Sequence, residues 1–247
     1  MDPAEADVTS VPASPATRAY HMAYKVVAYA GLMAILGALL HGFPHASGEP
    51  WSNFSYNLVL YAIFIAAHLV MTRPWFKSAF WGDPAGSSSE RRVFVLVSAV
   101  TWFAVILLAK PLPGDDLFNS SFLGFAGCLG FLASFLLFFQ GVTIAMLDGL
   151  LGVPGARGAF THGERTPLFV DGPYKDVRHP QYRGIVLAGI SSLLIHPNAA
   201  QFFWVLLIAG SFVAFIPVEE AQLIAARGES YRKYQEQTPH RIFKGIW

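Results

Sequence analysis

Residues 184–218 read GIVLAGISSLLIHPNAAQFFWVLLIAGSFVAFIPV and contain no Asp, Glu, Lys or Arg. The stretch is too long for one ordinary membrane span, because about 20 apolar residues cross the hydrocarbon core. The tripeptide 196–198 (HPN) interrupts it, since proline removes a helix hydrogen bond and asparagine favours turns. The stretch therefore predicts a helical hairpin with a short arm at about 180–195 and a longer arm at about 199–218.

The rest of the chain is similarly apolar. Of 247 residues, 54% are hydrophobic and 13% are charged, whereas charged residues make up about 25% of soluble domains. A net charge of +1 excludes the basic footprint of a nucleic-acid binder, and a single cysteine excludes a disulfide framework. Four further uncharged stretches predict helices at about 24–41, 54–72, 92–109 and 122–147. We expect an all-α integral membrane protein with about six transmembrane helices and a cytoplasmic amphipathic C-terminal helix.

Basic residues alternate along the connections between these spans. They occur before the first span, in 73–92, in 148–183 and in the C-terminal tail, whereas 42–53 and the hairpin tip have none. The positive-inside rule therefore places the basic connections and both termini in the cytoplasm. Residues 1–19 lack the basic region and cleavage site of a signal peptide. We predict that they form a disordered tail, followed by a single membrane domain over 20–247.

Polar side chains concentrate in two stretches, 160–184 and 217–241, which flank the hairpin. Because both stretches lie at the same side of the membrane, residues about forty positions apart should meet there. This juxtaposition makes the open end of the hairpin the candidate site.

Arg178 and His179 precede Pro180, which fits a first helical turn because its missing N–H costs nothing there. A helix N-terminus beside an arginine favours an anion, especially a carboxylate; the alternative is a pair of interfacial anchors next to lipid phosphates. Glu219 and Glu220 lie at a membrane boundary, where carboxylates are costly unless paired or hydrated. They could face a cationic or hydroxyl-bearing ligand, or be solvated residues that open an amphipathic helix.

Helical periodicity connects several further residues. A three- and four-residue spacing predicts one shared helix face for Glu220, Leu223, Ile224, Arg227, Tyr231 and Tyr234. His68 and Gln140 are polar residues inside predicted apolar helices, and such positions are candidates for function, although buried polar groups also serve as hydrogen-bonded packing residues. Gly124-x-x-Gly127-x-x-Gly130 predicts close helix packing.

Short motifs follow one another between 170 and 240. In order they are Gly172-Pro173-Tyr174, Arg178-His179-Pro180-x-Tyr182-x-Gly184, Glu219-Glu220 and Tyr231-x-x-Tyr234. This series resembles the isoprenylcysteine carboxyl methyltransferase and phospholipid methyltransferase superfamily. The stretch 57–77, followed by Glu90-Arg91, is similar to the bacterial methanethiol S-methyltransferase group, and more loosely to the membrane family associated with nitrite and nitric oxide reduction.

The resemblance implies an enzyme of the bacterial inner membrane that uses S-adenosylmethionine without a Rossmann domain, with the cofactor in 160–240. It implies catalytic roles for Arg178, His179 and Glu220. The implied cofactor-binding residues are Gly172, Tyr174, Arg178, His179, Tyr182, Gly184, Glu219, Glu220, Tyr231 and Tyr234. Arg178 and His179 would hold the methionine carboxylate or shape its pocket, and Glu219 or Glu220 would bind the amino group or the ribose hydroxyls. The acceptor would be a small thiol or a hydrophobic, lipid-like molecule, with His68 and Gln140 as candidate substrate residues and no metal ion or nucleic acid.

The sequence departs from the superfamily pattern in two places. Members often have Phe-Gly where this chain has Arg227-Gly228, and the link 152–165 is longer and richer in glycine. Three other classes remain open: a haem-containing or isomerase-like protein that pairs His68 with His179, an NADPH-dependent reductase, and a non-enzymatic subunit of a membrane complex.

Overall fold

The computed structural model describes residues 14–82, 88–140, 151, 168 and 170–247. The helices are α1 (Pro15–His41), α2 (Ser52–Met71), α3 (Pro74–Trp81), α4 (Ser88–Leu108), α5 (Ser121–Phe139), α7 (Pro180–Ile195), α8 (Ala199–Arg227) and α9 (Glu229–Gln237), with a 3-10 turn η1 (Gly172–Lys175). Two short parallel strands, β1 (His45–Ala46) and β2 (Leu112–Pro113), pair with each other. The predicted all-α class is therefore confirmed, apart from this two-residue bridge.

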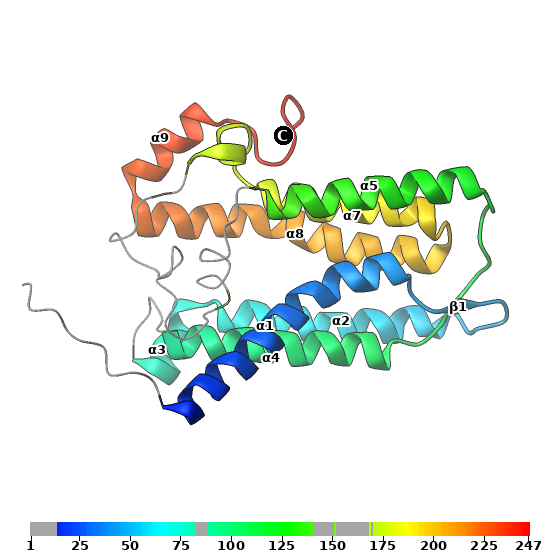
Figure 1. Cartoon of the computed structure of the whole chain (residues 1–247), viewed down its shortest axis with the longest axis horizontal. Helices are drawn as coiled ribbons and strands as arrows, with labels where there is room; N and C mark the ends of the chain where they lie inside the picture. The colour runs from blue at the N-terminus through cyan, green and yellow to red at the C-terminus, as the bar shows by residue number, and fades with distance from the viewer. Residues whose placement is uncertain (1–13, 83–87, 141–150, 152–167, 169) are drawn as a thin grey trace, which may run out of the picture.

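The long helices form two groups (Figure 1). One contains α5, α7 and α8, and the other contains α1, α2 and α4; α1 packs against both α4 and α7 and so joins the groups. The paired strands lie at the end of the molecule on the right of Figure 1, whereas α3, η1 and α9 lie at the opposite end. The core between the groups includes Trp102, Phe131 and Trp204, which are almost fully buried.

Five described helices are long and apolar enough to cross a membrane, namely α1, α2, α4, α5 and α8. Large apolar side chains such as Leu107 and Phe122 point outward and are exposed, as a lipid-facing surface requires. The short arm α7 has 16 residues and therefore spans about 24 Å. The count of six spans and the orientation of the termini stay predictions.

The predicted hairpin is present, and its short arm has the predicted bounds. At the tip, the Asn198 side chain accepts a hydrogen bond of 2.8 Å from the Gln201 amide, which caps α8. The long arm differs from the prediction, because α8 continues through Pro217 to Arg227. A proline inside a helix removes one hydrogen bond, and the other bonds of α8 carry the helix past it. Glu219 and Glu220 consequently lie within α8 and not beyond its end.

One other boundary also differs, and another is described only in part. Helix α1 begins at Pro15, where Ser14 caps it by accepting from the Thr17 amide at 3.1 Å, so residues 15–19 are helical and not a disordered tail. Residues 1–13 of that tail lie outside the described residues. Helix α5 ends at Phe139, and the part of the predicted helix over 141–147 lies outside the described residues.

Small residues bring α5 and α7 together, as the glycine spacing predicts for Gly127 and Gly130. A Cβ added to Gly127 would lie 2.9 Å from the Ser191 carbonyl oxygen, and one added to Gly184 would lie 2.8 Å from the backbone of Phe138. Gly124 has no neighbour within 4 Å of such an atom. Gly184, predicted as a cofactor-binding residue, therefore serves a helix contact.

Candidate functional site

The open end of the hairpin contains a buried ionic cluster in which α7 begins beside α8. The Arg178 Nε donates a hydrogen bond of 2.7 Å to Glu220 Oε1, and the His179 Nε2 lies 3.2 Å from the same oxygen. The second oxygen, Oε2, accepts from Arg241 Nε at 3.1 Å and from Arg241 Nη2 at 3.0 Å. The side chains of Arg178 and Glu220 are only 7% and 5% exposed. Both oxygens of Glu220 are therefore engaged by the protein itself.

The segment 238–247, here called the C-terminal segment, fixes the backbone of this cluster. The His179 amide donates to the Arg241 carbonyl oxygen at 2.8 Å, and Arg178 Nη1 donates to the Thr238 carbonyl oxygen at 2.7 Å. These groups precede the first turn of α7, where backbone N–H groups have no partner within the helix. The C-terminal segment thus supplies the acceptors that the start of α7 lacks.

Glu219 has a different environment from that of its neighbour Glu220. Its side chain is 34% exposed, because successive helix residues point about 100° apart. Its Oε2 accepts a hydrogen bond of 2.6 Å from the Tyr182 hydroxyl and lies 3.5 Å from His179 Nδ1. The His179 and Tyr182 rings stack, with centroids 5.3 Å apart and planes at 18°. Glu219 is therefore the carboxylate of this pair with room for a ligand.

Three tyrosines support the cluster from η1 and α9. The Tyr234 hydroxyl donates to the Tyr174 carbonyl oxygen at 2.8 Å, and Tyr231 and Tyr234 are buried. Burial raises the pKa of the Tyr174, Tyr231 and Tyr234 phenols, so they stay protonated donors at physiological pH. Gly228, with φ of +55°, separates α8 from α9. The predicted single helix face that joins Glu220 to Tyr231 is therefore wrong, because the helix breaks at Gly228, and Tyr234 contacts η1.

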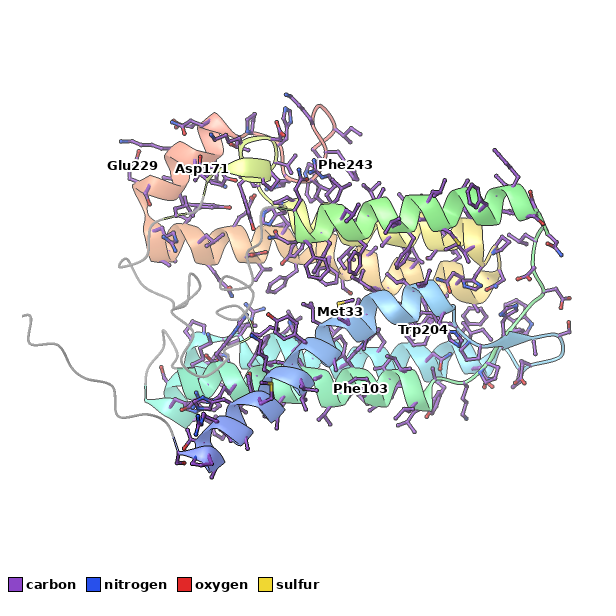
Figure 2. All side chains as sticks on the ribbon, viewed as in Figure 1. Met33, Phe103, Asp171, Trp204, Glu229 and Phe243 are labelled. Atoms are coloured by element: carbon purple, nitrogen blue, oxygen red, sulfur yellow. The ribbon has the colours of Figure 1, made fainter. Side chains whose placement is uncertain are left out.

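Figure 2 shows how these elements gather. Asp171 before η1 and Glu229 at the start of α9 lie at the upper left of the view, Phe243 of the C-terminal segment lies further along the same upper edge, and Trp204 lies toward the right. Gly172 opens η1 with φ of +61°, a conformation that glycine adopts without steric cost.

The two candidate substrate residues have different surroundings in the structure. His68 Nδ1 lies 3.0 Å from Ser98 Oγ, and the His68 ring packs 4.6 Å from the Phe94 ring, so His68 is a hydrogen-bonded packing residue in this structure. Gln140 is the exposed C-cap of α5 and not a residue inside an apolar helix. Arg91 of α4 interacts electrostatically with both His68 and Glu219, which connects the N-terminal helices with the candidate site.

Several residues of the stretch 57–77 and of Glu90-Arg91, on which the resemblance of the N-terminal half rests, make structural contacts. Asn57 makes two hydrogen bonds of 2.9 Å with the backbone of Lys110. Lys77 Nζ lies 3.7 Å from Glu90 Oε2 in a buried ion pair, which links α3 to the start of α4. These contacts give Asn57, Lys77 and Glu90 structural roles in the fold.

The structure thus brings Arg178, His179, Tyr182, Glu219 and Glu220 together. It adds Arg241 and Thr238, which the sequence motifs do not identify as site residues. A signal was present, because the polar stretch 217–241 includes both residues, but their separation from the Glu pair hides the contact.

Comparisons with known proteins find relatives that are named as methyltransferases. Methanethiol S-methyltransferase from Pseudomonas deceptionensis is 30% identical over 196 residues, which cover 73% of this chain and 69% of the relative. Methanethiol S-methyltransferase 2 from Bradyrhizobium diazoefficiens is 28% identical, covering 74% and 70%, and the methanethiol S-methyltransferase from Crocosphaera subtropica is 29% identical, covering 74% and 72%. No family model and no solved structure matches the chain. On these relationships, the chain belongs to the methanethiol S-methyltransferase family of membrane methyltransferases.

Proposed function

We propose that the chain transfers a methyl group from S-adenosylmethionine to a small thiol at the open end of the α7–α8 hairpin. The observation that carries the proposal is that relatives named for methyl transfer to methanethiol match about three quarters of the chain. The exposed edge of the ionic cluster, where the partly exposed Glu219 carboxylate contacts Tyr182 and the buried His179 ring, supplies the polar groups that such a reaction needs.

The side chains at this edge fit the cofactor chemically. S-adenosylmethionine supplies, when bound, a methyl group on a positively charged sulfur. The Glu219 carboxylate suits the amino group or the ribose hydroxyls of the cofactor, since it is partly exposed and ionised groups form strong hydrogen bonds. Within the described residues Arg178 uses Nε and Nη1, so we assign Nη2 to the cofactor's carboxylate.

The two neighbouring glutamates therefore have different roles, one structural and one in ligand binding. Glu220 is buried with both oxygens engaged, so it holds Arg178 and His179 in place. Glu219 has a free edge and contacts the ligand. This refines the implied roles, in which either glutamate could bind the cofactor.

The chain's own contribution to the reaction is positioning and proton transfer. S-adenosylmethionine, held by Glu219 and Arg178, would supply the methyl group: the thiol sulfur would bond to the methyl carbon while the bond from that carbon to the sulfonium sulfur broke and left its electron pair on that sulfur. The thiol proton would go to a base, for which the partly exposed Glu219 and the buried His179 beside it are the candidates. Correct alignment of reactants can supply roughly 7–11 kcal/mol of the barrier reduction.

The test is a thiol methylation assay on detergent-purified protein, with S-adenosylhomocysteine binding measured by calorimetry. We expect thioether formation that depends on S-adenosylmethionine, and at least tenfold weaker binding in Glu219→Gln with little change in melting temperature. Glu236→Gln, which alters an exposed residue of α9, is the matched control. Folded wild-type protein that neither binds the cofactor nor methylates thiols would overturn the proposal.

We further propose that the site faces the cytoplasm in a bacterial inner membrane. The start of α1, α3, the start of α4, η1 and α9 lie at one end of the molecule (Figure 1), and these elements contain most of the described Lys and Arg residues. The positive-inside rule places such an end in the cytoplasm. Reporter fusions at both termini should be active only as cytoplasmic reporters.

The haem alternative has less support in the contacts. His179 is engaged by the two glutamates, His68 by Ser98, and His196 lies at the hairpin tip with its Nε2 2.9 Å from the Leu40 carbonyl oxygen. An absorption spectrum of the purified protein tests this alternative, since a bound haem would give a Soret band.

A further inference from the structure

Arg241 makes more contacts with the candidate site than any role considered so far requires. It lies in the C-terminal segment, yet its guanidinium donates two hydrogen bonds to one oxygen of Glu220. Its carbonyl oxygen accepts from the His179 amide. Arg241 therefore contacts Glu220 through its side chain and His179 through its backbone.

The guanidinium of Arg241 is itself held in place. The Trp247 ring covers it, with the guanidinium carbon 4.8 Å from the ring centroid, and the Arg241 amide donates to the Trp247 carbonyl oxygen at 2.7 Å. A guanidinium sandwiched between an aromatic face and a carboxylate loses less entropy when it binds, because its planar fork is fixed beforehand.

These contacts decide which way the Glu220 carboxylate points. With Oε2 occupied by Arg241, only Oε1 is left for Arg178 and His179. Without Arg241, Oε2 could rotate toward Arg178, and the His179 ring would lose its fixed acceptor. The His179 ring is stacked on Tyr182, which in turn holds Glu219, so the displacement would reach the exposed edge.

We infer that Arg241 is a positioning residue for methyl transfer: it orients Glu220, and through Glu220 it sets His179, Tyr182 and Glu219 in register with the ligand. The inference rests on the proposed function and adds the C-terminal segment to its working parts. Arg241 itself does not touch the reacting atoms.

The test compares Arg241→Gln, Arg241→Lys and Lys244→Gln in the full-length protein. Lys244 is an exposed residue of the same segment, so its variant removes the same charge without altering the cluster. For each variant kcat, KM for the thiol, binding of S-adenosylhomocysteine and the melting temperature are measured. A displacement of about 1 Å at a reacting centre can cost on the order of 100-fold in rate.

We expect Arg241→Gln to lower kcat by 10- to 100-fold while KM for the thiol changes less than about threefold. Arg241→Lys should recover part of the loss, because it keeps the charge but not the two-pronged geometry, and Lys244→Gln should match wild type. A kcat per folded molecule that stays at the wild-type value in Arg241→Gln, with only the melting temperature lowered, would overturn the inference and leave the proposed function intact. Absence of thiol methylation by the wild type would overturn the proposed function first, and this inference with it.

Discussion

The two ends of the α7–α8 hairpin use polar residues in opposite ways. At the tip, Asn198 and Gln201 are fully buried. Gln201 Nε2 donates to the Leu39 carbonyl oxygen and to Ser192 Oγ, and Asn198 Nδ2 donates to Asp116 Oδ1. At the open end the partners are charged, and Glu219 keeps an exposed edge. Two buried amides with all their polar groups bonded form a structural joint at the tip, whereas the open end is built on a buried ion pair beside the partly exposed Glu219, where we propose that the ligand binds.

The largest effect should come from Glu220→Ala, which leaves the Arg178 guanidinium buried without its carboxylate. Breaking a buried ion pair costs about 3–5 kcal/mol, so we expect a clear drop in the melting temperature as well as loss of activity. Glu236→Ala on the exposed face of α9 is the control. An unchanged melting temperature would mean that the open end is not built on this ion pair, and the contrast with the tip would fail.

The next largest loss of stability is expected at the contact between α5 and α7. Gly184→Ala places a methyl group 2.8 Å from the Phe138 backbone, and overpacking of this kind costs about 1–3 kcal/mol. Gly124→Ala, near the start of α5, has open space and should be nearly neutral. Thermal unfolding of both variants checks this. If Gly184→Ala lost cofactor binding at full stability, the glycine would belong to the ligand site as the resemblance implies.

At the tip, Asn198→Ala should cost about 0.5–2 kcal/mol, the usual loss for a helix N-cap. The substitution removes the cap on the Gln201 amide and the hydrogen bond of 3.0 Å to Asp116 Oδ1. Because we assign the tip a structural role only, kcat per folded molecule should stay at the wild-type value. A fall in kcat without a fall in stability would show that the tip also takes part in function.

The smallest effect is expected for Tyr234→Phe, which removes one hydrogen bond to the Tyr174 carbonyl oxygen. Such a bond contributes about 0.5–1.5 kcal/mol. Since burial raises the pKa of Tyr234, the effect should be independent of pH from neutrality to mildly alkaline conditions. Melting curves at pH 7 and pH 9 measure it, and a difference that disappears at pH 9 would contradict the assignment of Tyr234 as a protonated donor.

Local signals in the sequence were sufficient to place the hairpin. Uncharged length, the interruption at 196–198 and Pro180 in the first turn predict both ends of α7. The meeting of Arg178 with Glu220 follows from the same signals, because an antiparallel hairpin returns the chain to its starting side. These features depend on residues next to each other or on one simple connection.

The remaining features depend on tertiary contacts that no local pattern contains. The other bonds of α8 carry it past Pro217, and the positive φ of Gly228 ends it. The difference between the partly exposed Glu219 and the buried Glu220 depends on the position of Arg241, which donates to Glu220. A contact across 21 residues and a helix break cannot be read from spacing alone.

The long separation between Arg178 and its partners bears on how the protein is made. Glu220 follows Arg178 by 42 residues and Thr238 follows it by 60. Since a chain emerges from the ribosome N-terminus first, Arg178 reaches the membrane before any of these acceptors exists. The nascent hairpin must therefore keep Arg178 in water or against lipid phosphates, and the site is assembled only after the hairpin has been inserted. Loss of Arg241 would then lengthen the life of this unfinished state, which makes it a target for membrane proteases.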